Sequence, residues 1–217
     1  MDDARRALVA GARAVADAGL VVGTAGNLSV RLGEEMLITP RRARLDATDP
    51  GRCVPVRLAD GAVTVALPDG VEPSSEAPLH RAVYAVSDAG AIVHTHSHFA
   101  TVLSTLVEEL PAVHYAMTAF GGRVRVAPYA TFGSDELAAS VAAALEGRSA
   151  ALLANHGAVT IGDTVDAAVD LAVQLEWLAS VCYHAALAGR PALLDDEQLA
   201  AVVEQSRRLR YDAAGQT

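Results

Sequence analysis

Hydrophobic and polar residues follow two different spacings near the start of the chain. Alanine, leucine and valine recur at helical spacing through residues 3–18, and Gly19 follows, which predicts an amphipathic helix that glycine ends. Two short strands are predicted next, in VVGTAGNLSVRL, which contains a Gly-Thr-Ala-Gly-Asn turn, and in MLIT.

The rest of the chain mixes further helical and strand-like segments. The patterns predict strands at 63–67, 91–96 and 123–129, a strand pair broken at Asn-His-Gly within 151–161, and helices at 74–90, 97–110, 134–147, 163–188 and 195–210. No segment repeats at a period of about 20 to 50 residues. We expect one α/β domain over residues 1–217, a three-layer sandwich with a central, mostly antiparallel sheet flanked by helices.

Composition and charge narrow the class of protein. Of the 217 residues 52% are hydrophobic and 20% charged, which suits a globular chain with a sizeable core. The formal net charge is −9 without a long basic run, so nucleic acid is not an expected partner. No stretch reaches the roughly 18 apolar residues of a membrane span, and the N-terminus lacks a signal peptide's apolar segment. Two cysteines, Cys53 and Cys182, cannot form a disulfide framework, so we expect a soluble, cytoplasmic protein.

Three histidines are the candidate ligands of a metal ion. His94 and His96 lie two residues apart on a predicted strand, where alternate side chains share one face. His156 lies in the Asn-His-Gly break and is the best third ligand. Three protein nitrogens that leave coordination positions of the metal open are typical of a catalytic zinc site. The alternative interpretation is that these three are ordinary polar histidines at strand ends. His98 begins a predicted helix and should turn away. The others lack metal-like spacing and are expected to be structural or solvent-facing: His80, His114 and His184.

Two segments have the composition of anion sites. Ser74 and Ser75 precede Glu76 at a predicted helix start, where hydroxyls and backbone amides can bind phosphate while the carboxylate moves a nearby proton. A serine cap followed by an acidic first turn is the simpler structural interpretation. Residues 23–27 form a second candidate phosphate loop because glycine lets backbone amides approach an anion, although the Gly-Lys-Ser/Thr ending of a P-loop is missing.

Seven motifs follow one another along the chain: GTAGNLSVR, LITP, PSSE, VHTH, PAVHY, APYATFG and NHG. In this order and spacing they resemble the class II aldolase/adducin family, and most closely its bacterial L-fuculose-1-phosphate aldolases. The resemblance runs from the first helix to Tyr211, and the stretch from PAVHY to APYATFGS is its most specific part.

The resemblance implies a metal site and an adjoining phosphate site. It implies one zinc ion per subunit, replaceable by cobalt or manganese, on the matches to His94, His96 and His156. It assigns the catalytic acid/base to Glu76. It also implies phosphate binding by a set of small residues: Gly26, Asn27, Ser74 and Ser75.

The resemblance further implies an assembly in which subunits share their active sites. Tyr115 would reach into the neighbouring subunit of a cyclic homotetramer and act there as a catalytic residue. Phe132 would line the pocket, and Tyr211 would help to close it over a sugar phosphate substrate. An excess of apolar residues on more than one face of helix 163–188 suits burial against such a partner.

One motif departs from the family pattern. After LITP the phosphate-binding aldolases usually continue with a hydroxyl residue and glycine, whereas this chain has Arg41 and Arg42. One possibility is that an arginine, taken here as Arg41, binds the substrate's anion through two hydrogen bonds of its guanidinium. Another is that the anionic end of the substrate differs from the phosphate of the family's substrates. The alternative is that both side chains point to solvent.

The resulting hypothesis is a zinc-dependent aldolase that cleaves a ketose 1-phosphate to dihydroxyacetone phosphate and a short aldehyde. Two alternatives share the fold: an L-ribulose-5-phosphate 4-epimerase, which the absence of an acidic residue in 111–129 disfavours, and a phosphosugar-acid decarboxylase, whose carboxylate an arginine could bind. A non-catalytic adducin-like binding module is a remote alternative, because such proteins lack the metal histidines. The sequence does not identify the aldehyde.

Overall fold

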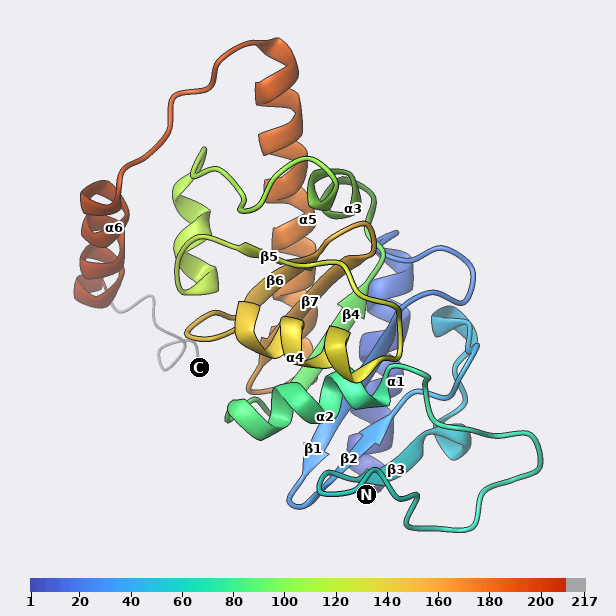
Figure 1. The fold of residues 1–217 in the computed structure, drawn as a ribbon. Helices are drawn as coiled ribbons and strands as arrows, with labels where there is room; N and C mark the ends of the chain where they lie inside the picture. The colour runs from blue at the N-terminus through green and yellow to red at the C-terminus, as the bar shows by residue number, and fades with distance from the viewer. Residues whose placement is uncertain (210–217) are drawn as a thin grey trace.

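A computed structural model describes residues 1–209 and places a single mixed sheet at the centre of the molecule (Figure 1). Its strands are β1 (Asn27–Leu32), β2 (Glu35–Ile38), β3 (Val54–Arg57), β4 (Ala91–Thr95), β5 (Arg125–Ala127), β6 (Ala150–Leu153) and β7 (Gly157–Gly162). They run in the order β3-β2-β1-β4-β7-β6-β5, and every neighbouring pair is antiparallel except β5–β6. The prediction of a mostly antiparallel central sheet is confirmed.

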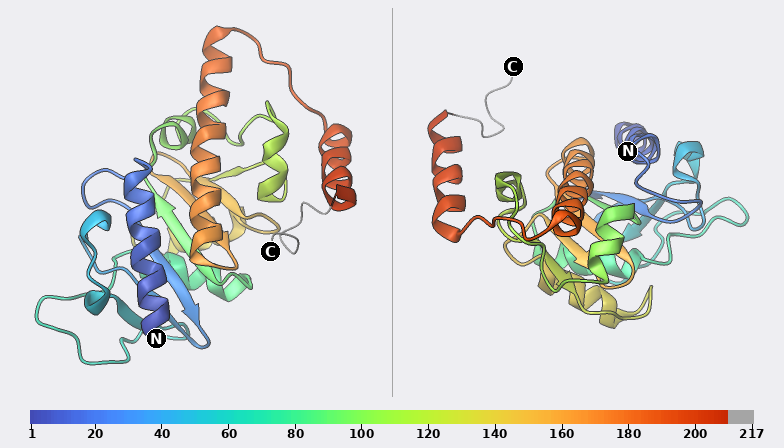
Figure 2. Two further views of the ribbon diagram at one scale, coloured as in Figure 1. Left: turned by 180° about the vertical axis from the view of Figure 1, so that it is seen from behind. Right: turned by 90° about the horizontal axis from the view of Figure 1, so that it is seen from above.

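Helices cover both faces of this sheet. They are α1 (Asp2–Asp17), α2 (Ala77–Val86), α3 (His98–Ser104), α4 (Asp135–Ala144), α5 (Val165–Ala188) and α6 (Asp196–Leu209), with 3-10 helices η1 (Leu45–Ala47), η2 (Pro50–Arg52) and η3 (Tyr115–Phe120). α1 and α5 lie on one face, and α2 and α4 lie on the other (Figures 1 and 2). The three layers of the expected α/β sandwich are therefore present.

The central strands are buried on both faces, because alternate side chains enter opposite cores. In β4, Ile92 belongs to the cluster beneath α2 and α4, and Val93 to the cluster beneath α1 and α5. Met36 and Leu37 of β2 divide in the same way. This double burial makes the middle of the sheet a rigid support for side chains at its strand ends.

Two expected elements differ from the structure. The strand predicted at 63–67 is wrong: Val63 forms only an isolated bridge with Val56, and the third strand is β3 instead. β3 contains Pro55, a residue type that central strands exclude, but an edge strand tolerates proline because one side of its backbone needs no partner. The helix predicted at 97–110 ends at Ser104, and Leu110 instead bonds to the backbone of Val124.

The C-terminal helix α6 stands apart from the three layers, as both views of Figure 2 show. It follows the long helix α5 after residues 189–195 and contacts η3. None of the helices within residues 1–209 is long and apolar enough to cross a membrane.

Candidate metal centre and active site

Two of the three predicted metal ligands come from the end of β4. His94 is the fourth residue of the strand and is fully buried, whereas His96 follows the strand end and is partly exposed. Nδ1 of His94 lies 3.0 Å from the carbonyl oxygen of Ala158 on the neighbouring strand β7. A carbonyl can only accept, so Nδ1 carries a proton, and Nε2 is the nitrogen that faces the centre.

His156 reaches the same point from the turn between β6 and β7. The turn is tight, because the preceding residue Asn155 adopts a left-handed backbone conformation with φ 57°. Gly157 begins β7 where any side chain would overlap the carbonyl oxygen of Thr95. Glycine therefore lets β7 approach β4 closely enough for the two histidine-bearing segments to meet.

The three imidazole rings converge on one point, and each pair is arranged edge to face. Their centroids are 4.8 to 4.9 Å apart and their planes cross at 72 to 85°. Nε2 of His94 lies 3.1 Å from Nε2 of His96. With Glu76, their ligand atoms all lie within 4.8 Å of one another.

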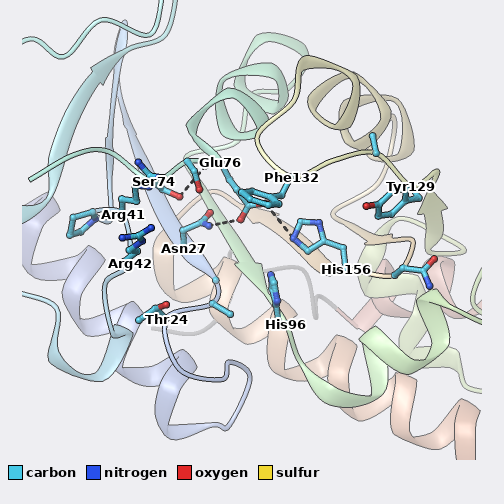
Figure 3. Close-up of a pocket in the computed structure, with 16 residues that line it drawn as sticks. Thr24, Asn27, Arg41, Arg42, Ser74, Glu76, His96, Tyr129, Phe132 and His156 are labelled. Carbon is cyan, nitrogen blue, oxygen red and sulfur yellow. Dashed lines mark hydrogen bonds and ion pairs between the residues drawn. The ribbon is translucent and has the colours of Figure 1, made fainter.

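Glu76 completes this cluster from the start of α2. The residue is only 6% exposed. Oε2 lies 3.1 Å from Nε2 of His94, and Oε1 lies 3.3 Å from Nε2 of His156. The side-chain amide of Asn27 donates a hydrogen bond of 2.8 Å to Oε2, and the hydroxyl of Ser74 accepts one from the Glu76 backbone amide. Figure 3 shows Glu76 held between Asn27 and His156.

The electrostatics of the cluster favour a cation beside Glu76. Burial alone would raise the pKa of Glu76, but His94, His156 and the Asn27 amide together hold that pKa well below its ordinary value. Burial lowers the pKa of His94, yet the nearby carboxylate more than offsets this and the pKa rises. Burial, followed by the charge of His94, lowers the pKa values of His96 and His156 to about 4. The site thus has a stable carboxylate and two neutral imidazoles around one position of positive charge.

The donor set fits a divalent metal ion. Ligands of a tetrahedral zinc ion at about 2.0 to 2.1 Å lie about 3.3 Å from one another. The separations from Nε2 of His94 to His96 and to Glu76, both 3.1 Å, and from Glu76 to His156, 3.3 Å, are close to this value. Oε1 of Glu76 is buried and has no hydrogen-bond partner among the described residues, so a cation would satisfy it. These residues form the one side-chain group of suitable geometry that the described part of the chain contains.

A cavity of about 450 Å³ opens over the cluster. The predicted site residues that line it are Gly26, Asn27, Arg41, Ser74, Ser75, Glu76, His96, Phe132 and His156. Gly26 leaves no room for a side chain, because a Cβ there would lie 2.9 Å from the carbonyl oxygen of His94. The glycine loop and the Ser-Ser-Glu segment thus meet at one cavity although they are far apart in the sequence.

Arg41 and Arg42 lie together at one end of this cavity, with Thr24 (Figure 3). The guanidinium of Arg41 pairs with Glu72 at 2.9 Å, whereas Arg42 takes part in no ion pair among residues 1–209. Arg42 also has a left-handed backbone conformation, with φ 55°. Of the two arginines that line the cavity, Arg42 is therefore the one whose charge no carboxylate of the described residues pairs.

The remaining predicted site residues are spread more widely. Phe132 lies at the cavity and is 66% exposed. Tyr115 lies in η3 with its ring stacked on His114 at 4.4 Å, and it does not line the cavity of its own chain. Tyr211 lies outside the described residues. His98 begins α3 and is not among the clustered ligands.

Sequence reasoning missed several residues around the site. Tyr129 and Asn155 line the cavity. Tyr129 shares the motif APYATFG with Phe132, and Asn155 shares the motif NHG with His156, so membership of these motifs was the signal that could have identified them. His80 was expected to be structural or solvent-facing; it is fully buried, which agrees with the structural alternative, but its bond to the site residue Asn27 was not foreseen. Its signal was the spacing of four residues from Glu76, which puts both on one face of a helix.

Comparison with known proteins identifies the family. The family described as Class II Aldolase and Adducin N-terminal domain matches residues 6–183. The chain is 40% identical over 203 residues to a 5-methylthioribulose-1-phosphate/5-deoxyribulose-1-phosphate aldolase of Rhodospirillum rubrum, covering 93% of this chain and 90% of the relative. It is 39% identical over 190 residues to the L-fuculose phosphate aldolase of Escherichia coli K12, covering 86% of each.

Solved structures show the same likeness. A structure of L-fuculose 1-phosphate aldolase aligns with a TM-score of 0.89 at 35% identity, covering 95% of this chain and 97% of that chain. The L-fuculose-1-phosphate aldolase of Thermus thermophilus aligns with a TM-score of 0.74 at 30% identity, covering 87% of this chain and 97% of that chain. From sequence, fold and the composition of its site, the chain belongs to the class II aldolase and adducin family, among its aldehyde-lyases.

Proposed function

We propose that the protein is a zinc-dependent aldolase that cleaves a ketose 1-phosphate, of the L-fuculose 1-phosphate kind, to dihydroxyacetone phosphate and a short aldehyde. The observation that carries this proposal is the cluster of His94, His96, His156 and Glu76 beneath the cavity. One end of that cavity carries glycine-loop amides, serine hydroxyls and arginine, which suit the phosphate of a sugar phosphate.

Each part of the cavity would have a separate task. A divalent cation held by the three histidines would stabilise the negative charge that develops when the carbon–carbon bond breaks. Glu76 would move the proton at the carbon that becomes nucleophilic, from a position that the Asn27 amide helps to fix. Gly26, Asn27, Ser74 and Ser75 would bind the phosphate, and Phe132 would line the pocket.

Tyr115 would complete the site from the next subunit of a cyclic homotetramer. Tyr115 is 57% exposed and does not line the cavity of its own chain, which supports a role in the cavity of a neighbouring subunit. There it would transfer the proton of the oxygen that becomes the aldehyde. Tyr211 would help to close the same shared site.

The physiological substrate is one of a small group with a common cleaved half. The relatives are named for L-fuculose phosphate, 5-methylthioribulose 1-phosphate and 5-deoxyribulose 1-phosphate. We further propose a cytoplasmic location, since both cysteines, Cys53 and Cys182, are free thiols, as is common in a reducing compartment.

The proposal is tested by presenting these three ketose phosphates to zinc-loaded protein and measuring dihydroxyacetone phosphate with a coupled enzyme. We expect release from at least one substrate. The His96→Ala variant should remain folded but lose most of its metal and its activity, because one of three nitrogen ligands is gone. Full metal content and activity in that variant would contradict the site assignment.

Two further measurements decide between related reactions. Epimerisation of L-ribulose 5-phosphate without release of dihydroxyacetone phosphate would indicate the epimerase, and release of carbon dioxide from a phosphosugar acid would indicate the decarboxylase.

The role of Glu76 is tested by a separate variant. Glu76→Gln should slow solvent deuterium exchange into dihydroxyacetone phosphate by about 10²-fold or more, because it removes the base while keeping the shape of the side chain.

A further inference from the structure

A chain of buried polar groups leads from Glu76 away from the cavity. The Asn27 amide donates to Glu76 at 2.8 Å, and its oxygen lies 2.6 Å from Nε2 of His80. Nδ1 of His80 lies 2.6 Å from the hydroxyl of Ser29, which lies 2.9 Å from the hydroxyl of Tyr84. Asn27 and Ser29 are alternate residues of β1, and His80 and Tyr84 lie one turn apart on α2.

The chemistry of these groups fixes the direction of each hydrogen bond. The amide oxygen of Asn27 can only accept, so Nε2 of His80 must carry a proton. The ring is fully buried, and burial, reinforced by the charge of His94, lowers the pKa of His80 to about 3. A neutral ring with its proton on Nε2 must accept at Nδ1 from Ser29. The Ser29 oxygen then accepts from the Tyr84 hydroxyl, so every donor points toward Glu76.

We propose that His80 is a positioning residue for the reaction, which holds the Asn27 amide with its NH₂ group toward Glu76 and the cavity. This inference rests on the proposed function only for its effect on catalysis. With its oxygen occupied by His80, Asn27 cannot turn an acceptor toward the carboxylate. One N–H bonds to Glu76, and the second belongs to an NH₂ group at the wall of the cavity, which Asn27 lines.

The orientation matters because a reversed amide would put two acceptors face to face. The oxygen of Asn27 would then repel the ionised carboxylate of Glu76, and the cavity would present an acceptor to an anionic substrate. A buried histidine that only filled the core would contribute to stability but not to the turnover of a folded enzyme. The two roles therefore predict different measurements.

The first measurement is the tautomer of His80 in the zinc-loaded, full-length protein. With ring ¹⁵N-labelled histidine, His80 should show a protonated Nε2 and a bare Nδ1 that do not titrate between about pH 5 and pH 8. The signals are assigned by their disappearance in His80→Gln. A proton on Nδ1 would overturn the proposal. This result does not depend on any activity, so it stands even if the proposed function fails.

The second measurement separates positioning from packing by two substitutions at one site. His80→Leu keeps an apolar group in the core without a donor, and it should lower kcat for deuterium exchange by about 10-fold or more. His80→Gln can still donate to the Asn27 oxygen, so it should recover most of the lost rate. His184→Leu makes the same change at an exposed histidine of α5 and is the matched control.

Ser29→Ala keeps the test decisive if His80→Leu does not fold. It removes the hydrogen bond at Nδ1 and leaves His80 in place, so only the Asn27 contact holds the ring, and kcat should fall with metal content unchanged. Wild-type kcat in folded Ser29→Ala and His80→Leu, or a loss in His80→Gln equal to that in His80→Leu, would overturn the proposal.

Discussion

The neighbours of two buried histidines, His94 and His80, determine which ring nitrogen carries a proton and in which direction the pKa moves. A carbonyl oxygen fixes the proton of His94, and an amide oxygen fixes the proton of His80. Both rings are fully buried, but one lies beside a carboxylate and the other beside neutral groups. The same residue type therefore has a raised pKa in the first case and a lowered one in the second.

The lowered pKa of His80 predicts a measurable loss of stability in acid. The unfolded chain protonates this histidine below about pH 6.5, whereas the folded chain, with a pKa of about 3, does not. Between these values the unfolded state binds more protons, so the free energy of unfolding falls as pH falls. Urea denaturation at pH 7 and pH 5 should show a fall that is smaller in His80→Leu than in wild type, by about 2 kcal/mol. Equal falls would mean that His80 titrates normally.

Replacement of Arg42 by glycine should weaken substrate binding but should not lower the stability of the protein. A non-glycine residue in the left-handed conformation costs about 1 kcal/mol, and here the side chain has its charge at the cavity. Arg42→Gly should raise KM for the ketose phosphate by about 10-fold, because the charge is lost, while the melting temperature stays level or rises. Arg41→Ala is the control, and it should change KM little because Arg41 pairs with Glu72. The reverse ranking would assign the anion to Arg41.

At the scale of helices and strands, the sequence predicted most elements because their faces have clear periods. It failed where an element depends on its place in the sheet. The proline in β3 is compatible with a strand only at an edge, and edge position is a tertiary property. Within the site, strand spacing could predict that His94 and His96 meet, but the junction with Glu76 depends on how α2 packs on the sheet.

The close approach of β4 and β7 predicts that Gly157 cannot be replaced. Gly157→Ala would force a methyl group into the Thr95 carbonyl and displace His156 from the other ligands. We expect a loss of about 1 to 3 kcal/mol in stability and a lower zinc content after dialysis, measured by thermal melting and elemental analysis. Gly51→Ala is a matched control in the exposed 3-10 helix η2, where the nearest atom is a side-chain oxygen at 3.3 Å. Normal zinc retention by Gly157→Ala would mean that the strands can separate without cost to the site.

At the scale of the whole molecule, the site is incomplete without a second copy if Tyr115 has its proposed role. Tyr115→Phe and His96→Ala subunits should each be nearly inactive alone. After mixing and random reassembly, about a quarter of the interfaces would combine an intact metal site with an intact tyrosine, and activity should return to about that fraction. No recovery despite proven subunit exchange would mean that Tyr115 serves its own subunit or none.

The division of the site between sheet and loops has a consequence for how such a molecule can change. His94 is buried in a central strand, whereas Arg41, Arg42 and Phe132 lie in exposed loops around the cavity. A graft of the loop at 39–44 from a relative should therefore transfer that relative's preference for one anion, while the metal and the bond-breaking chemistry stay as they are. The scaffold would keep one reaction and let its substrates be exchanged.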